Sequence, residues 1–80
     1  MSKQDKLLQS IFNATASLRF EDACKIAELI GFSRKGGQGS HVVYGRDDEM
    51  TLLNFQNRNG MIKPYQIRQL RDMVEKYGKQ

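Results

Sequence analysis

The sequence predicts an α+β domain in which helices pack on one face of a small three-stranded antiparallel sheet. Apolar residues recur at helical spacing near both ends of the chain, and between these regions the period changes to two. Short connections rich in glycine or aspartate separate the period-two segments, and connections this short join antiparallel strands. The expected order is helix, helix, three strands, helix.

The length of 80 residues predicts one domain over residues 1–80, with an N-terminal helix and linker at 1–17 and a core at 18–78. The single cysteine, Cys24, has no internal disulfide partner and is interpreted as a small buried hydrophobe. The sequence has neither a signal peptide pattern nor an apolar run near the ~20 residues that span a bilayer. We therefore expect a cytoplasmic protein that does not enter membranes.

The two N-terminal helices are predicted from apolar spacing. In residues 3–12, Leu7 and Leu8 are each followed four positions later by another apolar residue, so both pairs lie on one helical face. The second helix is expected to begin near Phe20, because two acidic residues there suit the positive end of a helix. Gly31 offers a left-handed C-terminal cap.

Three strands are predicted at residues 32–35, 40–44 and 50–55, joined by residues 36–39 and 45–49. Both faces of these strands carry apolar residues, so the period does not decide which face the helices cover. The second connection contains three successive acidic residues and is interpreted as a solvated turn.

The last helix is expected to begin at Pro64, because proline fits the first helical turn, where its missing N–H is no loss. Its apolar positions continue at spacings of three and four to Tyr77, and Gly78 is expected to cap it.

Basic residues are segregated from acidic ones. The formal net charge is +4, and neither residues 29–46 nor residues 50–71 contain an acid. Such a distribution is typical of a face that meets a polyanion, and we interpret this polyanion as nucleic acid. A solvated basic surface without a partner is the alternative. The candidate RNA-binding residues are Arg34, Lys35, Gly39, Ser40, Lys63, Arg68 and Arg71.

The stretch from Gly36 to His41 is the candidate site of chemistry. Its three glycines allow a phosphate to approach the backbone amides closely. His41 is the only histidine of the chain, and histidine exchanges protons near neutral pH. The alternative is a mobile hairpin turn followed by a half-buried histidine.

Three sequence motifs carry a family resemblance. They are Gly31-Phe32 at a helix end, Gly39-Ser40-His41 followed by Val42-Val43-Tyr44, and Asn59-Gly60 followed by Lys63-Pro64-Tyr65-Gln66-Ile67. In this order and spacing, residues 18–77 resemble the HicA-like toxin family. The resemblance implies an αβββα fold similar to a double-stranded RNA-binding domain.

The resemblance also implies an activity and two partners. It implies a small toxin that cleaves mRNA, held inactive by a HicB-like antitoxin, with His41 as the histidine required for cleavage. The chain departs from the family at Gly36-Gly37, where relatives usually carry bulkier residues, and at Val42, which replaces a basic residue or a second histidine.

RNA carries its own nucleophile, so one histidine and nearby cations suffice for a cleavage mechanism. We expect His41 to act as general base or acid, and the amides of residues 36–40 together with Lys35 to hold the scissile phosphate. No cofactor and no metal-ligand set is predicted. Two alternatives remain open: an RNA-binding module without catalysis, and a protein-interaction domain for an acidic partner.

Overall fold

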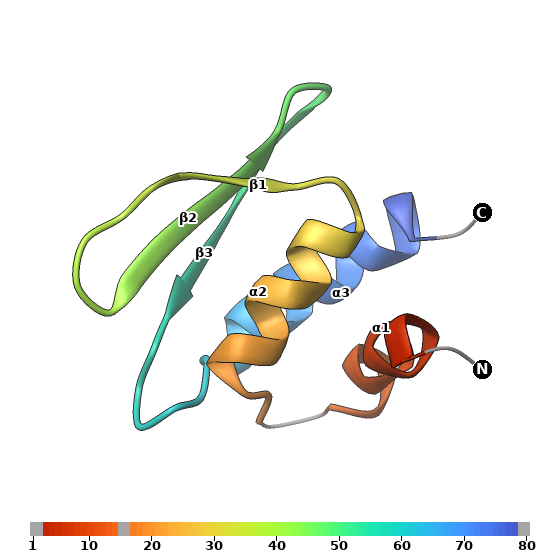
Figure 1. The fold of residues 1–80 in the computed structure, drawn as a ribbon, viewed down its shortest axis with the longest axis horizontal. Helices are drawn as coiled ribbons and strands as arrows, with labels where there is room; N and C mark the ends of the chain where they lie inside the picture. Colours follow the sequence, from red (N-terminus) through yellow and green to blue (C-terminus); the bar gives the residue numbers. More distant parts are fainter. Residues whose placement is uncertain (1–2, 15–16, 79–80) are drawn as a thin grey trace.

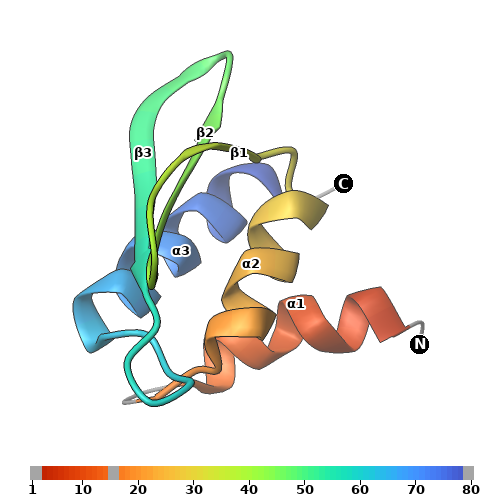
Figure 2. The same ribbon diagram turned by 60° about the vertical axis from the view of Figure 1, so that its left-hand side comes forward.

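The computed structural model describes residues 3–14 and 17–78 of the chain. Its elements are α1 (Lys3–Asn13), α2 (Phe20–Leu29), β1 (Ser33–Gly36), β2 (His41–Arg46), β3 (Glu49–Gln56) and α3 (Pro64–Tyr77). The strands form one antiparallel sheet in the order β1-β2-β3, with the helices gathered on one side of it (Figures 1 and 2). The predicted α+β class and element order are confirmed, whereas the likeness to a double-stranded RNA-binding domain stays a prediction.

Alternation along β2 and β3 shows which sheet face the helices cover. The buried apolar side chains of these strands are Val42, Tyr44, Leu53 and Phe55. His41 and Asn54, which have the opposite parity, are exposed. We call the uncovered side of the sheet the open face.

All three helices contribute to one core. Ile11 of α1, Ile26 of α2 and Leu70 of α3 are each fully buried in the same apolar cluster. The N-terminal helix is thus packed into the domain. Cys24 is partly buried against this cluster, and burial raises the pKa of its thiol.

Glycine and proline lie at the ends and starts of the helices largely as the sequence predicts. Gly31 adopts a left-handed conformation with φ of 92° just after Ile30, the C-cap residue of α2, and Pro64 begins α3. Gly78 caps α3 with φ of −84°, so this glycine does not use a left-handed conformation. Asn59 and Gly60 have φ of 55° and 85°, as a two-residue hairpin turn requires.

The connection between β2 and β3 is shorter than the sequence suggests. β2 continues to Arg46 and β3 begins at Glu49, so only Asp47 and Asp48 form the turn. The register shifts between Tyr44 and Arg46, which marks a β-bulge.

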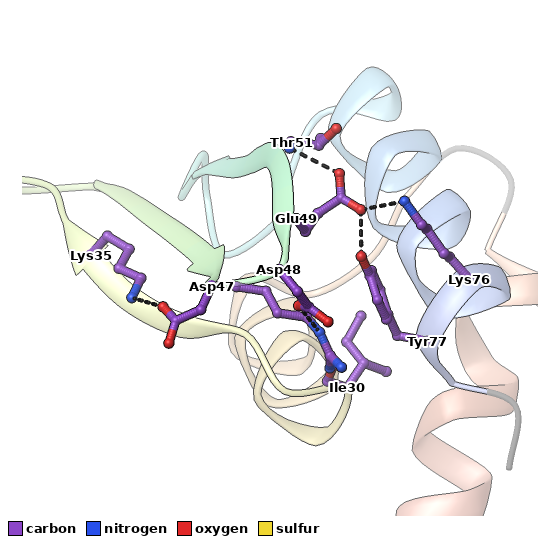
Figure 3. Close-up of polar contacts among 9 residues, drawn as sticks. Ile30, Lys35, Asp47, Asp48, Glu49, Thr51, Lys76 and Tyr77 are labelled. Carbon is purple, nitrogen blue, oxygen red and sulfur yellow. Dashed lines mark hydrogen bonds and ion pairs between the residues drawn. The ribbon is translucent and has the colours of Figure 1, made fainter.

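The interpretation of this acidic run as a solvated turn is wrong for Glu49. Its side chain is only 6% exposed, and its Oε1 accepts hydrogen bonds from Lys76 Nζ at 2.6 Å and Tyr77 Oη at 2.5 Å (Figure 3). The backbone N–H of Thr51 donates to Oε2 at 2.9 Å. The carboxylate therefore fastens the start of β3 to the end of α3.

Arg46 ties the same end of the hairpin to α2. Its Nη1 donates to the carbonyl of Ile30 at 2.6 Å, and its Nε donates to Asp48 at 2.6 Å. The guanidinium carbon lies 4.1 Å from the centre of the Tyr77 ring. These contacts fix the Arg46 end of β2, whereas His41 stands at the other end of this strand.

No helix of the described ranges is long and apolar enough to cross a membrane.

Candidate nucleic-acid interface

His41 stands at the first position of β2 with its side chain exposed. Its backbone N–H donates to the carbonyl of Gln38 at 3.0 Å, which closes a tight turn. The carbonyl of Ser40 accepts a hydrogen bond from the N–H of Asn57 at 2.8 Å. Both polar groups of the peptide between Ser40 and His41 are therefore hydrogen-bonded, whereas the imidazole of His41 stays open to solvent.

Gly37 packs directly on the backbone of His41. It has φ of 121°, and a Cβ added to it would lie 2.3 Å from the His41 carbonyl oxygen and 2.7 Å from the Cα of Val42. Gly39 also has a positive φ, of 60°. Only glycine fits at Gly37, because any side chain would meet backbone that cannot yield. The glycine turn is thus packed against the strand that carries His41.

The neighbours of His41 across the sheet are two amides. His41 pairs with Gln56 of β3, and Val43 pairs with Asn54. Paired residues share a face, so all four side chains lie on the open face. Gln56 is directly opposite His41, with Cβ atoms about 4.5–5.5 Å apart, and Asn54 is its diagonal neighbour at about 7–8 Å.

A buried glutamine brings the start of α3 to this end of the sheet. Gln66 is 2% exposed, and its Oε1 accepts hydrogen bonds from the backbone N–H groups of Gln56 at 3.3 Å and Lys63 at 2.9 Å. Its Nε2 donates to the hydroxyl of Tyr65 at 3.3 Å, and Tyr65 is 48% exposed. Lys63 therefore lies at the His41 end of the sheet.

Lys35 shares the open face with His41 but lies farther along it. A Cβ on Gly45 would meet Leu52 on one side at 3.0 Å and Lys35 on the other at 3.1 Å, so these side chains flank Gly45. Gly45 is four residues from His41, or about 13 Å along a strand. The ammonium of Lys35 is 3.4 Å from Asp47, in the turn at the far end of β2 (Figure 3).

Three arginines lie on other surfaces. Arg34 pairs with Tyr44 and therefore points to the helix side of β1. Arg68 precedes the fully buried Leu70 by two positions, a rotation of about 200°, so it faces away from the core. Arg71, one position after Leu70, is partly buried on the flank of α3. Of the predicted site residues, the fold gathers four at one end of the sheet: Gly39, Ser40, His41 and Lys63.

The opposite end of the sheet holds a polar hollow of about 350 Å³. Its lining residues are Gly31, Ser33, Lys35, Gly45, Arg46, Asp47 and Asp48. Its charged groups already pair with one another, Lys35 with Asp47 and Arg46 with Asp48. Within residues 3–14 and 17–78, no three His, Cys, Asp or Glu side chains gather as a metal site would require.

No protein-family model, curated protein or solved structure matches this chain. The resemblance to the HicA-like family therefore rests on the sequence motifs alone.

Sequence reasoning did not identify Asn54 and Gln56 as neighbours of His41. The strand period places His41 and Val43 on one face of β2, but the partners on β3 depend on the register. A two-residue turn without a bulge would pair His41 with Asn54, and only the register shift between Tyr44 and Arg46 places Gln56 opposite His41. The sequence pattern does not indicate this bulge.

Proposed function

We propose that this protein is an RNA-cleaving toxin of the HicA kind, with His41 as general base or acid and mRNA as its substrate. The observation that supports this best is the exposed His41, which stands at the end of the sheet where Gly39, Ser40 and Lys63 also lie. A HicB-like antitoxin is the proposed protein partner, and the cytoplasm, where mRNA is found, is the proposed location.

The proposed reaction uses the RNA as its own nucleophile. His41 takes the proton from a 2′-hydroxyl, the 2′-oxygen bonds to phosphorus, and the bond from phosphorus to the 5′-oxygen breaks. If His41 acts instead as the acid, it gives its proton to the departing 5′-oxygen. Backbone N–H groups of the glycine turn and the ammonium of Lys63 stabilise negative charge on the phosphate.

The remaining basic residues hold RNA away from the reacting phosphate in this proposal. Lys35 lies about four residues along the open face and contacts a phosphate beyond the scissile one. Arg68 and Arg71 lie on α3, whose start is fastened beside His41, so they contact RNA that passes around this helix.

An RNA-binding module without catalysis is the second candidate. One observation favours it: the side chains opposite and diagonal to His41 are the amides of Gln56 and Asn54, which do not titrate. In a cleavage mechanism His41 would have to transfer protons without a second titratable side chain opposite or diagonal to it.

Induced expression in a bacterial host tests the proposal. The wild-type chain, His41→Ala and the control Gln9→Ala, an exposed amide on α1, are compared at matched soluble protein levels. We expect growth arrest and loss of bulk mRNA for the wild type and the control only. Arrest without mRNA loss, equal in all three, would support the binding module instead.

A further inference from the structure

Two amide side chains form a row beside His41 on the open face. Gln56 lies directly across from His41, and Asn54 lies one pair farther along the same face of β3. Asn54 is exposed and Gln56 is partly exposed. Neither was a candidate from the sequence, and neither belongs to the proton transfer proposed above.

The backbone under this row is fixed from the helix side. The N–H of Gln56 donates to the buried Gln66, and the N–H of Asn57 donates to Ser40 in the turn that precedes His41. Phe55, between the two amides, is 1% exposed and packs into the core. The amides are therefore presented from a rigid strand, which gives a polar contact geometric precision.

The open face also suits a nucleotide electrostatically. The strand residues placed on it include Lys35 and His41 and no carboxylate. Val43 and Leu52 add apolar surface between these polar groups. The Asp47 carboxylate lies 3.4 Å from the Lys35 ammonium, in the turn at the far end of β2. At the His41 end a phosphate backbone meets no carboxylate of the strands, and a base meets both apolar and hydrogen-bonding side chains.

We propose that Asn54 and Gln56 bind the edge of a base in an unpaired RNA strand that crosses the open face beside His41. This inference rests on the proposed function for the identity of the ligand as RNA. An amide donates and accepts at once, which matches the Watson–Crick or Hoogsteen edge of a base. In duplex RNA the base edges of the deep, narrow major groove are out of reach of side chains, so these contacts select unpaired RNA.

A binding experiment tests the substrate class. A 20-nucleotide RNA of mixed sequence, single-stranded or annealed to its complement, is titrated into His41→Ala protein, which separates binding from cleavage. We expect the single strand to bind at least about tenfold more tightly. Adding Asn54→Ala or Gln56→Ala to this background weakens single-strand binding by about tenfold, whereas adding Gln9→Ala leaves it unchanged.

Mapping of the cut sites tests the base contact. With His41 intact, Asn54→Ala and Gln56→Ala are expected to change which base is found beside the cut sites in a long RNA. A loss of stability would lower cleavage at all sites without changing that preference. Thermal unfolding of each variant is expected to match the wild type, because neither amide is buried.

The outcomes separate this inference from the proposed function. Cleavage that needs His41, with binding and cut sites unchanged in both amide variants, would overturn the inference and leave the proposed function standing. Single-strand binding that needs both amides, without cleavage by the wild type, would support the inference and overturn catalysis. Equal affinity for duplex and single strand, or affinity for an acidic protein but for no RNA, would also overturn the inference.

Discussion

The carboxylate of Glu49, at the start of β3, accepts a hydrogen bond at 2.6 Å from the ammonium of Lys76, near the end of α3. The hydroxyl of Tyr77 and the N–H of Thr51 also donate to this carboxylate. The two residues lie 27 positions apart in the sequence, with the rest of β3 and most of α3 between them. Glu49 is therefore a long-range connection between the hairpin and the helical layer (Figure 3).

This connection predicts a pH dependence of stability. The hydrogen bonds from Lys76 and Tyr77 lower the pKa of Glu49 from 4.5 to about 2. Because the folded-state pKa is depressed, the stabilisation is present above about pH 4.5 and is lost as the pH falls towards 2. Glu49→Gln is expected to lower the urea midpoint at pH 7 and to lose this acid dependence, measured by urea unfolding between pH 7 and 2.

Glu75→Gln is the control, because it changes an exposed carboxylate one residue before Lys76. We expect its unfolding curve to follow the wild type over the whole pH range. If Glu49→Gln and the wild type instead lost stability in parallel as the pH fell, Glu49 would not be the group responsible.

Two adjacent glycines are predicted to respond differently to the same substitution. Gly37→Ala places a methyl group against the His41 carbonyl and forces alanine into a positive φ, at a cost of roughly 1–3 kcal/mol. If the protein cleaves RNA as proposed, the shift of His41 is also expected to lower the cleavage rate. At Gly36 a Cβ would meet nothing within 4 Å, so Gly36→Ala is expected to change stability by less than about 0.5 kcal/mol. Urea unfolding and cleavage of a labelled RNA measure both effects, and equal behaviour of the two variants would contradict the packing described for Gly37.

Two glutamines on α3 provide a second matched pair. Gln66→Leu leaves the N–H groups of Lys63 and Gln56 without their acceptor, at a cost of roughly 2 kcal/mol or more. Gln69 has a buried Oε1 that receives no hydrogen bond within the described part of the chain, so Gln69→Leu is expected to be neutral or stabilising. Urea unfolding of both proteins checks this difference. A larger loss for Gln69→Leu would mean that the polar roles of these residues are reversed.

The layered arrangement of this fold was predictable because its signals are local. Spacings such as Leu7 to Ile11 and the change to period two near Gly31 depend only on which residues must be buried. The left-handed cap at Gly31 and the start of α3 at Pro64 follow equally from backbone sterics.

The register beside His41 was not predictable. A two-residue turn at Asp47-Asp48 without a bulge would pair His41 with Asn54, but the bulge moves the pairing to Gln56. A register shift of two residues leaves each side chain on the same face of the sheet but changes the residue that it pairs with. The role of Glu49 was hidden for a similar reason, since its partners lie 27 and 28 residues away in the sequence.

The distribution of charge along the sequence predicted more RNA-binding residues than the fold brings together at one place. Segregation along the sequence groups Arg34, Lys35, Lys63, Arg68 and Arg71. In the sheet, however, neighbouring residues such as Arg34 and Lys35 point to opposite faces, and helical rotation turns Arg68 away from the core. A charge pattern along the chain therefore indicates a kind of partner without fixing which residues meet it together.

Cleavage of RNA by the purified protein tests the central proposal most directly. A labelled single-stranded RNA is incubated with wild type, with His41→Ala and with Gln9→Ala, and the termini of the products are analysed. General acid–base catalysis by His41 predicts a rate at least ~100-fold lower for His41→Ala than for the other two proteins. It also predicts products with a 2′,3′-cyclic phosphate and a 5′-hydroxyl, and no cleavage where the 2′-hydroxyl is replaced by hydrogen. Equal rates for all three proteins, or cleavage that does not need the 2′-hydroxyl, would contradict the account.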